Sequence, residues 1–121
     1  MSPFDLLQEA ARILDEKKAH NQRAIRITEQ TIIADYFLIV TGNSTTHIKS
    51  LADELEHQLK EQHGIVPKAS EGRTTGWILL DYGTVLVHVF LKDQREFYNL
   101  ERLWEDGETV QLAIGEQPPE A

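Results

Sequence analysis

Apolar residues recur along this chain with two different periods, and the longer period indicates helices. Between residues 3 and 18 they return every three or four positions, which predicts an amphipathic helix that starts after Ser2. The same spacing over residues 45–63 predicts a second helix, and Gly64 stands where a helix C-terminal cap is expected. A third helix is predicted for residues 92–106.

The third predicted helix carries large apolar side chains on one side. Phe97, Leu100 and Trp104 are spaced so that they fall along a single stripe, and Gly107 follows where the helix should end. A stripe of this kind serves either core packing or contact with a partner, and the spacing alone favours neither.

Period-two alternation and short apolar runs predict the strands. They fall at residues 24–28, 36–40, within 66–72, and at 77–80 and 85–90. This order of elements predicts one α/β domain, residues 1–107, in which a mixed and mainly five-stranded sheet packs with about three helices. Residues 108–121 are predicted to form a flexible acidic tail.

The last two predicted strands form a hairpin whose faces differ. If Tyr82 and Gly83 make a two-residue loop, Asp81 lies opposite Thr84 and Trp77 lies opposite His88. One face then holds only aliphatic side chains and reads as core: Ile78, Leu80, Val85, Val87 and Val89. The other face is mixed: Trp77, Leu79, Asp81, Thr84, Leu86, His88 and Phe90.

The mixed face has two interpretations. It can be an ordinary layer under a helix, with Trp77 filling space and Asp81 supporting the turn through its side chain. It can also be a surface that a helix covers in part and a partner covers in part. A slip of one residue in the register would exchange the faces, so both interpretations depend on the loop length.

Composition narrows the function classes. The chain has 121 residues, no cysteine and a formal net charge of −8. Disulfides and cysteine nucleophiles are therefore excluded, and a reducing cytoplasm is the expected location. The acidic balance argues against much direct nucleic-acid contact. It would suit a basic protein as the partner, but the same charge can serve only to keep the chain soluble, and composition does not decide between the two. No apolar run reaches the length of a membrane span, so no membrane association is expected.

Candidate chemistry is sparse. The strand, the TGNS turn at residues 41–44 and the following helix could offer backbone N–H groups to an anion, so a nucleotide-binding or nucleotidyl-transfer enzyme is the alternative function. However, no GK[ST] or G-x-G-x-x-G motif is present, and no D-x-D pair is available for two metal ions. The five histidines include no i, i+4 pair. We expect no enzyme activity, metal or cofactor.

Several motifs in collinear order resemble the Iojap, or ribosomal silencing factor, family. They are TGNS with His47, Ala52-Asp53, Glu71-Gly72, Trp77 followed by ILLD, Gly83, VHVF and the segment from Tyr98 to Trp104. The resemblance covers about residues 5 to 105. It implies a small mixed α/β domain, distantly similar to nucleotidyltransferases but without their catalytic carboxylates. It also implies binding to the large ribosomal subunit through ribosomal protein L-fourteen, which obstructs joining of the small subunit and lowers translation when nutrients are scarce.

The resemblance implies a set of partner-binding residues. Trp77 and Trp104 would be apolar anchors, and Asp81 and Glu101 would meet Lys or Arg on the partner. The full set is Trp77, Asp81, Tyr82, Tyr98, Glu101 and Trp104. The apolar side of the hairpin would also suit a homodimer.

Overall fold

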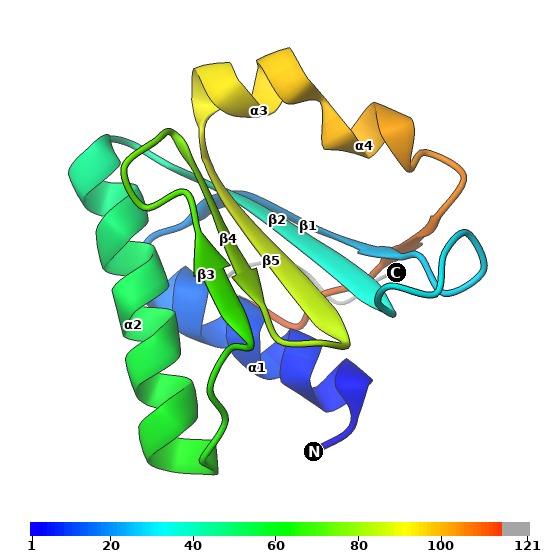
Figure 1. Ribbon diagram of the computed structural model, residues 1–121, viewed down its shortest axis with the longest axis horizontal. Coiled ribbons are helices and arrows are strands. Elements are labelled where there is room, and N and C mark those ends of the chain that lie inside the picture. Colours follow the sequence, from blue (N-terminus) through cyan, green and yellow to red (C-terminus); the bar gives the residue numbers. More distant parts are fainter. Residues whose placement is uncertain (115–121) are drawn as a thin grey trace.

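The computed structural model describes residues 1–114, which fold into three layers. Helices α1 (Pro3–Glu16) and α2 (Thr45–His63) cover one face of the sheet, and the short helices α3 (Lys92–Tyr98) and α4 (Leu100–Leu103) lie over the other (Figure 1). The strands are β1 (His20–Arg26), β2 (Tyr36–Gly42), β3 (Ala69–Glu71), β4 (Trp77–Asp81), β5 (Val85–Leu91) and β6 (Glu108–Val110).

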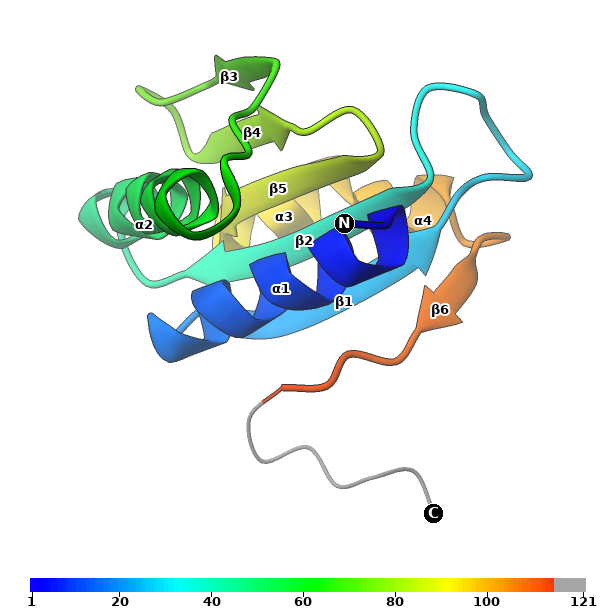
Figure 2. The same cartoon turned by 90° about the horizontal axis from the view of Figure 1, so that it is seen from below.

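The sheet is mixed, which confirms the predicted α/β class. Its six strands run in the order β3-β4-β5-β2-β1-β6. The central strands β2 and β5 are parallel and pair over seven positions, from Tyr36 opposite Val85 to Gly42 opposite Leu91. All other neighbours are antiparallel. Figure 2 shows α1 in front of β1 and β2, with α2 beside it and seen nearly end-on.

Helix α2 begins and ends where the sequence predicts, whereas α1 begins as predicted but ends at Glu16, two residues before the predicted end. The hydroxyl oxygens of Ser2 and Ser44 each accept a hydrogen bond of 3.0 Å, from the backbone N–H of Asp5 and His47. Gly64 ends α2 with a φ of 67°, the left-handed conformation that costs glycine little. Within residues 1–114, no helix is both long and apolar enough to cross a membrane.

The main core lies between α1, α2 and the sheet, and it is aliphatic. Every residue of the predicted aliphatic hairpin face is fully buried there, as that prediction required. The helices contribute their apolar stripes: Leu6, Leu7, Ala10, Ala11, Ile13 and Leu14 from α1, and Ile48, Leu51, Ala52, Leu55 and Leu59 from α2.

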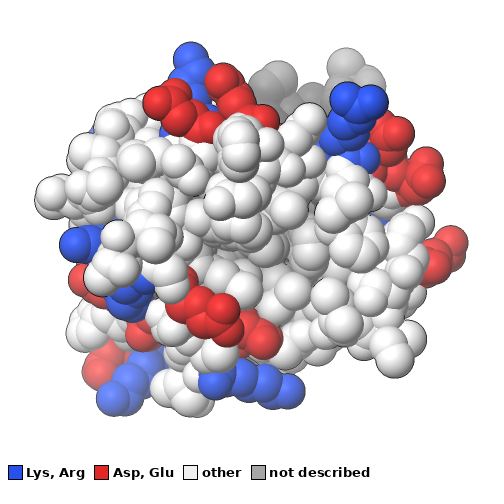
Figure 3. All heavy atoms as spheres, turned by 45° about the horizontal axis from the view of Figure 1, so that its top comes forward, with Lys and Arg blue, Asp and Glu red and all other residues white. Residues whose placement is uncertain are grey.

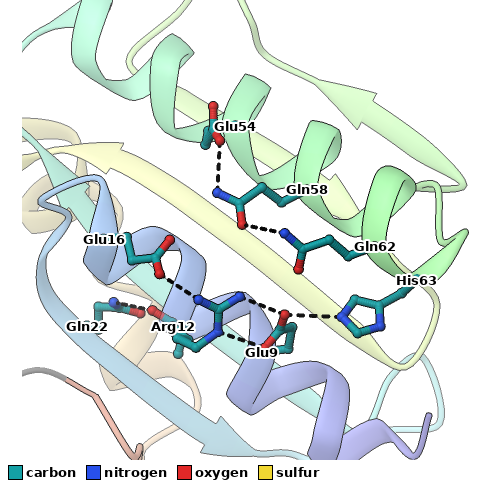
Figure 4. A network of polar contacts seen from close by, with 9 residues as sticks. Glu9, Arg12, Glu16, Gln22, Glu54, Gln58, Gln62 and His63 are labelled. Carbon is teal, nitrogen blue, oxygen red and sulfur yellow. Dashed lines mark hydrogen bonds and ion pairs between the residues drawn. The ribbon is translucent and has the colours of Figure 1, made fainter.

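A polar network joins the outer sides of α1 and α2 (Figure 4). Arg12 donates hydrogen bonds to Glu9 at 2.8 Å and Glu16 at 2.6 Å, and the His63 ring at the end of α2 lies 3.1 Å from Glu9. The Arg12 hydrogen bond, helped by His63, lowers the pKa of Glu9 to about 2. Because these ion pairs are partly exposed, they contribute little to the free energy of unfolding, and their main effect is to align the two helices.

The hairpin register differs from the prediction by two residues. Asp81 lies opposite Leu86 and Leu79 lies opposite His88, because the turn is centred one residue later than predicted, on Gly83 and Thr84 instead of Tyr82 and Gly83. The turn closes through the N–H of Tyr82, which donates to the carbonyl of Val85 at 3.0 Å. A shift of two keeps every side chain on its predicted face, so the division into an aliphatic and a mixed face stands.

The third predicted helix is broken. Asn99 takes a φ of 48°, which ends α3 and starts α4. The predicted single stripe was therefore wrong for Phe97, which is 78% exposed, whereas Leu100 and Trp104 pack against the sheet. Asparagine tolerates the left-handed conformation better than most residues, but nothing in the helical spacing itself signals the break.

The flexible tail was predicted to begin too early in the sequence, at residue 108. Residues 108–110 form β6, which pairs with β1, and Leu112 is only 5% exposed. A three-residue edge strand leaves too short a pattern to recognise from sequence. The last part of the predicted tail, residues 115–121, lies outside the described residues.

The break at Asn99 gives a prediction about stability. Asn99→Ala should lower the free energy of unfolding by about 1 kcal/mol, because alanine disfavours a positive φ. Asn99→Gly should leave it nearly unchanged. Chemical denaturation of both variants measures the difference. Equal stability of the alanine and glycine variants would contradict a required left-handed conformation at this position.

Candidate partner-binding surface

The two short helices cover the mixed face of the sheet only in part. Phe97, Tyr98 and Leu103 are 78%, 48% and 72% exposed, which is unusual for such large apolar side chains. Four further residues are half-buried beside or beneath them: Trp77, Leu79, Leu86 and Trp104. We call these seven residues the aromatic face. Figure 3 shows this side of the molecule, where uncharged side chains fill a broad area and charged groups lie mostly toward its margin.

Aromatic rings form a continuous chain across this face. The ring of Tyr98 lies 4.7 Å from Trp77, and Trp77 lies 5.9 Å from His88, measured between centroids. His88 lies 4.6 Å from Phe37, and Phe37 lies 5.3 Å from Trp104, in edge-to-face geometry. The structure therefore brings Trp77, Tyr98 and Trp104, three of the predicted partner-binding residues, onto one surface.

Trp77 is both packed and accessible. Its ring stacks on Phe90 at 4.9 Å, and its indole Nε1 donates a hydrogen bond to His88 Nδ1 at 3.1 Å. Its outer side borders a shallow hollow of about 240 Å³ together with Glu71, Gly72 and Leu79. Core packing alone and surface exposure alone each describe only half of Trp77, because one side of its ring belongs to the core and the other side meets solvent.

His88 lies beneath Trp77 and is 4% exposed. Burial among apolar groups lowers its pKa to about 4, so the ring is neutral at physiological pH. Sequence analysis placed His88 on the mixed face, but it could not show that the imidazole would be the hydrogen-bond acceptor for Trp77.

A polar network holds the short helices to the sheet. The guanidinium of Arg95 donates two hydrogen bonds to Glu101, at 3.0 and 2.9 Å. It also donates to the hydroxyl of Thr41 at 2.8 Å and to the carbonyl of Asn21 at 2.7 Å. The hydrogen bonds from Arg95 lower the pKa of Glu101, with a smaller contribution from Arg23 at 3.6 Å. One arginine thus joins β1, β2 and both short helices.

This network changes the interpretation of Glu101. The sequence suggested that its carboxylate would meet a partner, whereas the structure commits both carboxylate oxygens to arginines of the same chain. Arg95 was missed because Asn21 and Thr41 are distant from it in sequence, and because Glu101 lies beyond the break at Asn99 that the helical spacing does not show.

The two remaining predicted residues lie at the hairpin turn. Asp81 Oδ1 accepts a hydrogen bond of 2.8 Å from the N–H of Gly83, which is the turn-supporting role. Tyr82 is 8% exposed and packs in the aliphatic core on the opposite side of the sheet, where burial raises the pKa of its hydroxyl. Its burial removes Tyr82 from the surface that a partner can reach.

The TGNS turn borders a separate hollow of about 600 Å³ at the carboxyl ends of β2 and β5. The side chain of His47, in the first turn of α2, braces this turn. Its Nδ1 accepts from the N–H of Asn43 at 2.8 Å, and its Nε2 lies 3.0 Å from the carbonyl of Lys17. The N–H groups of Asn43 and His47 and the hydroxyl of Ser44 are therefore already engaged within the chain.

Carboxylates are also scarce around this hollow. Asp93 is the one acidic side chain in its lining: His20, Asn21, Thr41, Gly42, Asn43, Ser44, Leu91, Lys92 and Asp93. Across residues 1–114, no three His, Asp or Glu side chains converge in a way that could hold a metal ion. The arrangement therefore gives little support to metal-assisted nucleotidyl transfer.

Fold and surface together define a small mixed α/β domain whose distinctive feature is an exposed aromatic face of the kind found at protein interfaces. Comparison with known families gives a match over residues 2–121 to the family described as "Ribosomal silencing factor during starvation". The chain belongs to this family. The resemblance seen in the sequence motifs is thereby confirmed.

Two curated bacterial relatives match along nearly their whole length, and a plant relative matches along about half of its length. Ribosomal silencing factor RsfS of Halalkalibacterium halodurans is 46% identical over 113 residues, which cover 93% of this chain and 96% of the relative. The Bacillus subtilis protein of the same name is 40% identical, with 95% and 98% covered. The mitochondrial Iojap-related protein of Arabidopsis thaliana is 33% identical over 81% of this chain and 55% of its own length.

Solved structures show the same fold. A Chromobacterium violaceum protein matches with a TM-score of 0.83 at 30% identity and covers 98% of both chains. A Bacillus halodurans protein matches with a TM-score of 0.79 at 43% identity, covering 90% of this chain and 99% of its own. The expected distant likeness to nucleotidyltransferases stays a prediction.

The Arg95 network gives a second stability prediction. Arg95→Met should lower the free energy of unfolding by about 2 kcal/mol, because it leaves the partly buried Glu101 carboxylate without its main hydrogen-bond donor. Arg12→Met removes an exposed arginine with two carboxylate partners and should cost less than about 1 kcal/mol. Denaturant titration of both variants makes the comparison. Equal losses would show that Arg95 contributes no more than a surface pair.

The lowered pKa of Glu101 gives a pH prediction. A carboxylate whose pKa is lower in the folded state than in the unfolded state stabilises the fold at pH values above its unfolded pKa, which is 4.5 for Glu101. This stabilisation is lost as the pH falls through the pKa of the folded state. Wild type should therefore exceed Glu101→Gln in stability at pH 7, and the gap should narrow below pH 4.5. Glu105→Gln, at an exposed glutamate, is the control. A gap that stays constant with pH would contradict the assignment.

Proposed function

We propose that this chain is a non-enzymatic translational repressor that binds the large ribosomal subunit. The aromatic face is its contact surface, and ribosomal protein L-fourteen is its partner there. By covering part of the surface where the subunits meet, the bound chain obstructs joining of the small subunit and lowers translation under nutrient limitation. The proposed location is the cytoplasm, where ribosomes and free subunits occur together.

The observation that carries this proposal is the aromatic face itself. Phe97, Tyr98 and Leu103 remain exposed although the fold has an aliphatic core elsewhere that could bury such side chains. Partner-binding hot spots are rich in tryptophan and tyrosine, and their central part is poor in charge. Membership of the silencing-factor family supports the ribosome as the target, and the family resemblance is the basis for naming L-fourteen.

Electrostatics favour a basic protein over ribosomal RNA as the direct contact. The chain carries a net charge of −8, so long-range attraction would guide it toward basic ribosomal proteins and away from exposed phosphates. The aromatic face would then supply affinity after the encounter, because its centre holds apolar groups instead of charges.

The first test is co-sedimentation of the purified chain with free large subunits at moderate salt, followed by addition of small subunits. We expect the chain to travel with large subunits and to slow joining, measured by light scattering. Failure to co-sediment would contradict ribosome binding. Co-sedimentation without slower joining would contradict the steric mechanism.

A photo-crosslinking residue at position 97 should form its adduct with L-fourteen, and an adduct with RNA alone would overturn that assignment.

A substitution pair tests the contact surface. Phe97→Ala should weaken binding to large subunits about tenfold, as expected for a truncated interface residue. Because Phe97 is 78% exposed, its loss should change the free energy of unfolding by less than about 0.5 kcal/mol. Val66→Ala is the matched control, since Val66 is 60% exposed and lies outside the aromatic face. Equal effects of the two substitutions would exclude Phe97 from the interface.

The apolar side of the hairpin, which the sequence suggested for a homodimer, is buried against α1 and α2, so a second copy of the chain would have to use the aromatic face instead. Sedimentation velocity of wild type and Phe97→Ala distinguishes the occupants. A dimer that Phe97→Ala dissociates, together with unchanged binding to large subunits, would assign the aromatic face to self-association instead of the ribosome.

A further inference from the structure

His88 and Thr41 are buried polar side chains within residues 1–114, as is the hydroxyl of Tyr82 on the other side of the sheet. Thr41 accepts a hydrogen bond from Arg95 and so belongs to the network that holds the short helices. The His88 ring instead makes one hydrogen bond, which it accepts from the indole N–H of Trp77. Trp77 lies at the start of β4 on the aromatic face.

The hydrogen bond defines the state of the imidazole. Nδ1 accepts from the indole N–H of Trp77, so the proton of the neutral ring lies on Nε2. Nε2 is buried and has no partner among the described residues. An unpaired buried N–H costs free energy, and leucine would fill a similar volume without that cost. Core packing alone therefore does not account for a histidine at this position.

The surroundings of His88 fix its ring and leave Nδ1 directed at Trp77. Phe37 packs edge-on against the imidazole at 4.6 Å, and Phe90 lies beneath the indole at 4.9 Å. Stacking on Phe90 supports the indole plane but does not set its rotation within that plane. The hydrogen bond supplies this missing constraint, because it requires Nε1 to point at a fixed atom.

We propose that His88 is a positioning residue for partner binding: its Nδ1 holds the indole of Trp77 in the orientation that the aromatic face presents to a protein partner. Orienting the ring before binding reduces the side-chain entropy lost on association. This proposal rests on the proposed function in one respect, namely that the aromatic face contacts the large subunit.

Two substitutions separate positioning from packing. His88→Leu keeps the volume and removes the acceptor, whereas His88→Asn places an amide oxygen near the position of Nδ1. His88→Leu is also made together with Trp77→Phe, which keeps an aromatic ring but cannot donate. Each variant is measured for affinity to purified large subunits and for the NMR resonance of the Trp77 indole N–H. The other tryptophan, Trp104, is identified with Trp104→Phe.

We expect His88→Leu to lower the affinity about tenfold and to move the Trp77 indole resonance upfield, consistent with loss of one hydrogen bond. His88→Asn should retain most of the affinity and a resonance close to that of wild type. In the Trp77→Phe background, His88→Leu should cause no further loss of affinity.

Two results would overturn the positioning role. One is an equal loss of affinity from His88→Leu in the wild-type and Trp77→Phe backgrounds, since the loss would then not pass through the indole N–H. The other is an indole resonance that does not change in His88→Leu. If wild type fails to bind large subunits, the proposed function fails, and the indole resonance still decides whether Nδ1 holds Trp77.

Discussion

The parallel pairing of β2 with β5 is the constraint on which the rest of the structure depends. The two strands are far apart in sequence, yet they pair over seven positions at the centre of the sheet. The crossover between them carries α2, which packs with α1 on one face. The pairing also sets Phe37 beside Leu86 and Ile39 beside His88 on the other face. Both layers are built outward from this one pair of strands.

The two faces of the sheet are covered by different physical means. Long amphipathic helices bury the first face with aliphatic side chains, so that layer is closed to solvent. The second face is covered by eleven helical residues in two pieces, seven in α3 and four in α4. Arg95 secures these pieces by hydrogen bonds instead of a wide apolar contact. The helices therefore stay in place while their large side chains remain exposed.

Sequence patterns predicted the fold where interactions are local. The helix start after Ser2, the helix end at Gly64 and the two-faced hairpin depend on residues close in the chain, and they were predicted correctly. The register was wrong by two, and the break at Asn99 and strand β6 were missed, because tertiary contacts decide them. At the candidate site, Trp77, Tyr98 and Trp104 were named as partner-binding residues from the sequence, whereas Phe97 and Leu103 were not. The roles of Tyr82 and Glu101 follow from burial and from an ion pair across the helix break, which a single sequence does not reveal.

The chain of rings from Tyr98 to Trp104 couples the stability of the fold to the surface that we propose for partner binding. Its inner members, Phe37 and His88, belong to the core, and its outer members reach solvent. A rigid core beneath an exposed ring lowers the entropy cost of binding, so affinity can come from few contacts. The same coupling means that a substitution at Phe37 or His88 changes the exposed surface, although neither side chain is itself exposed. Measurements of affinity on this face are therefore interpretable only beside the unfolding free energy of each variant.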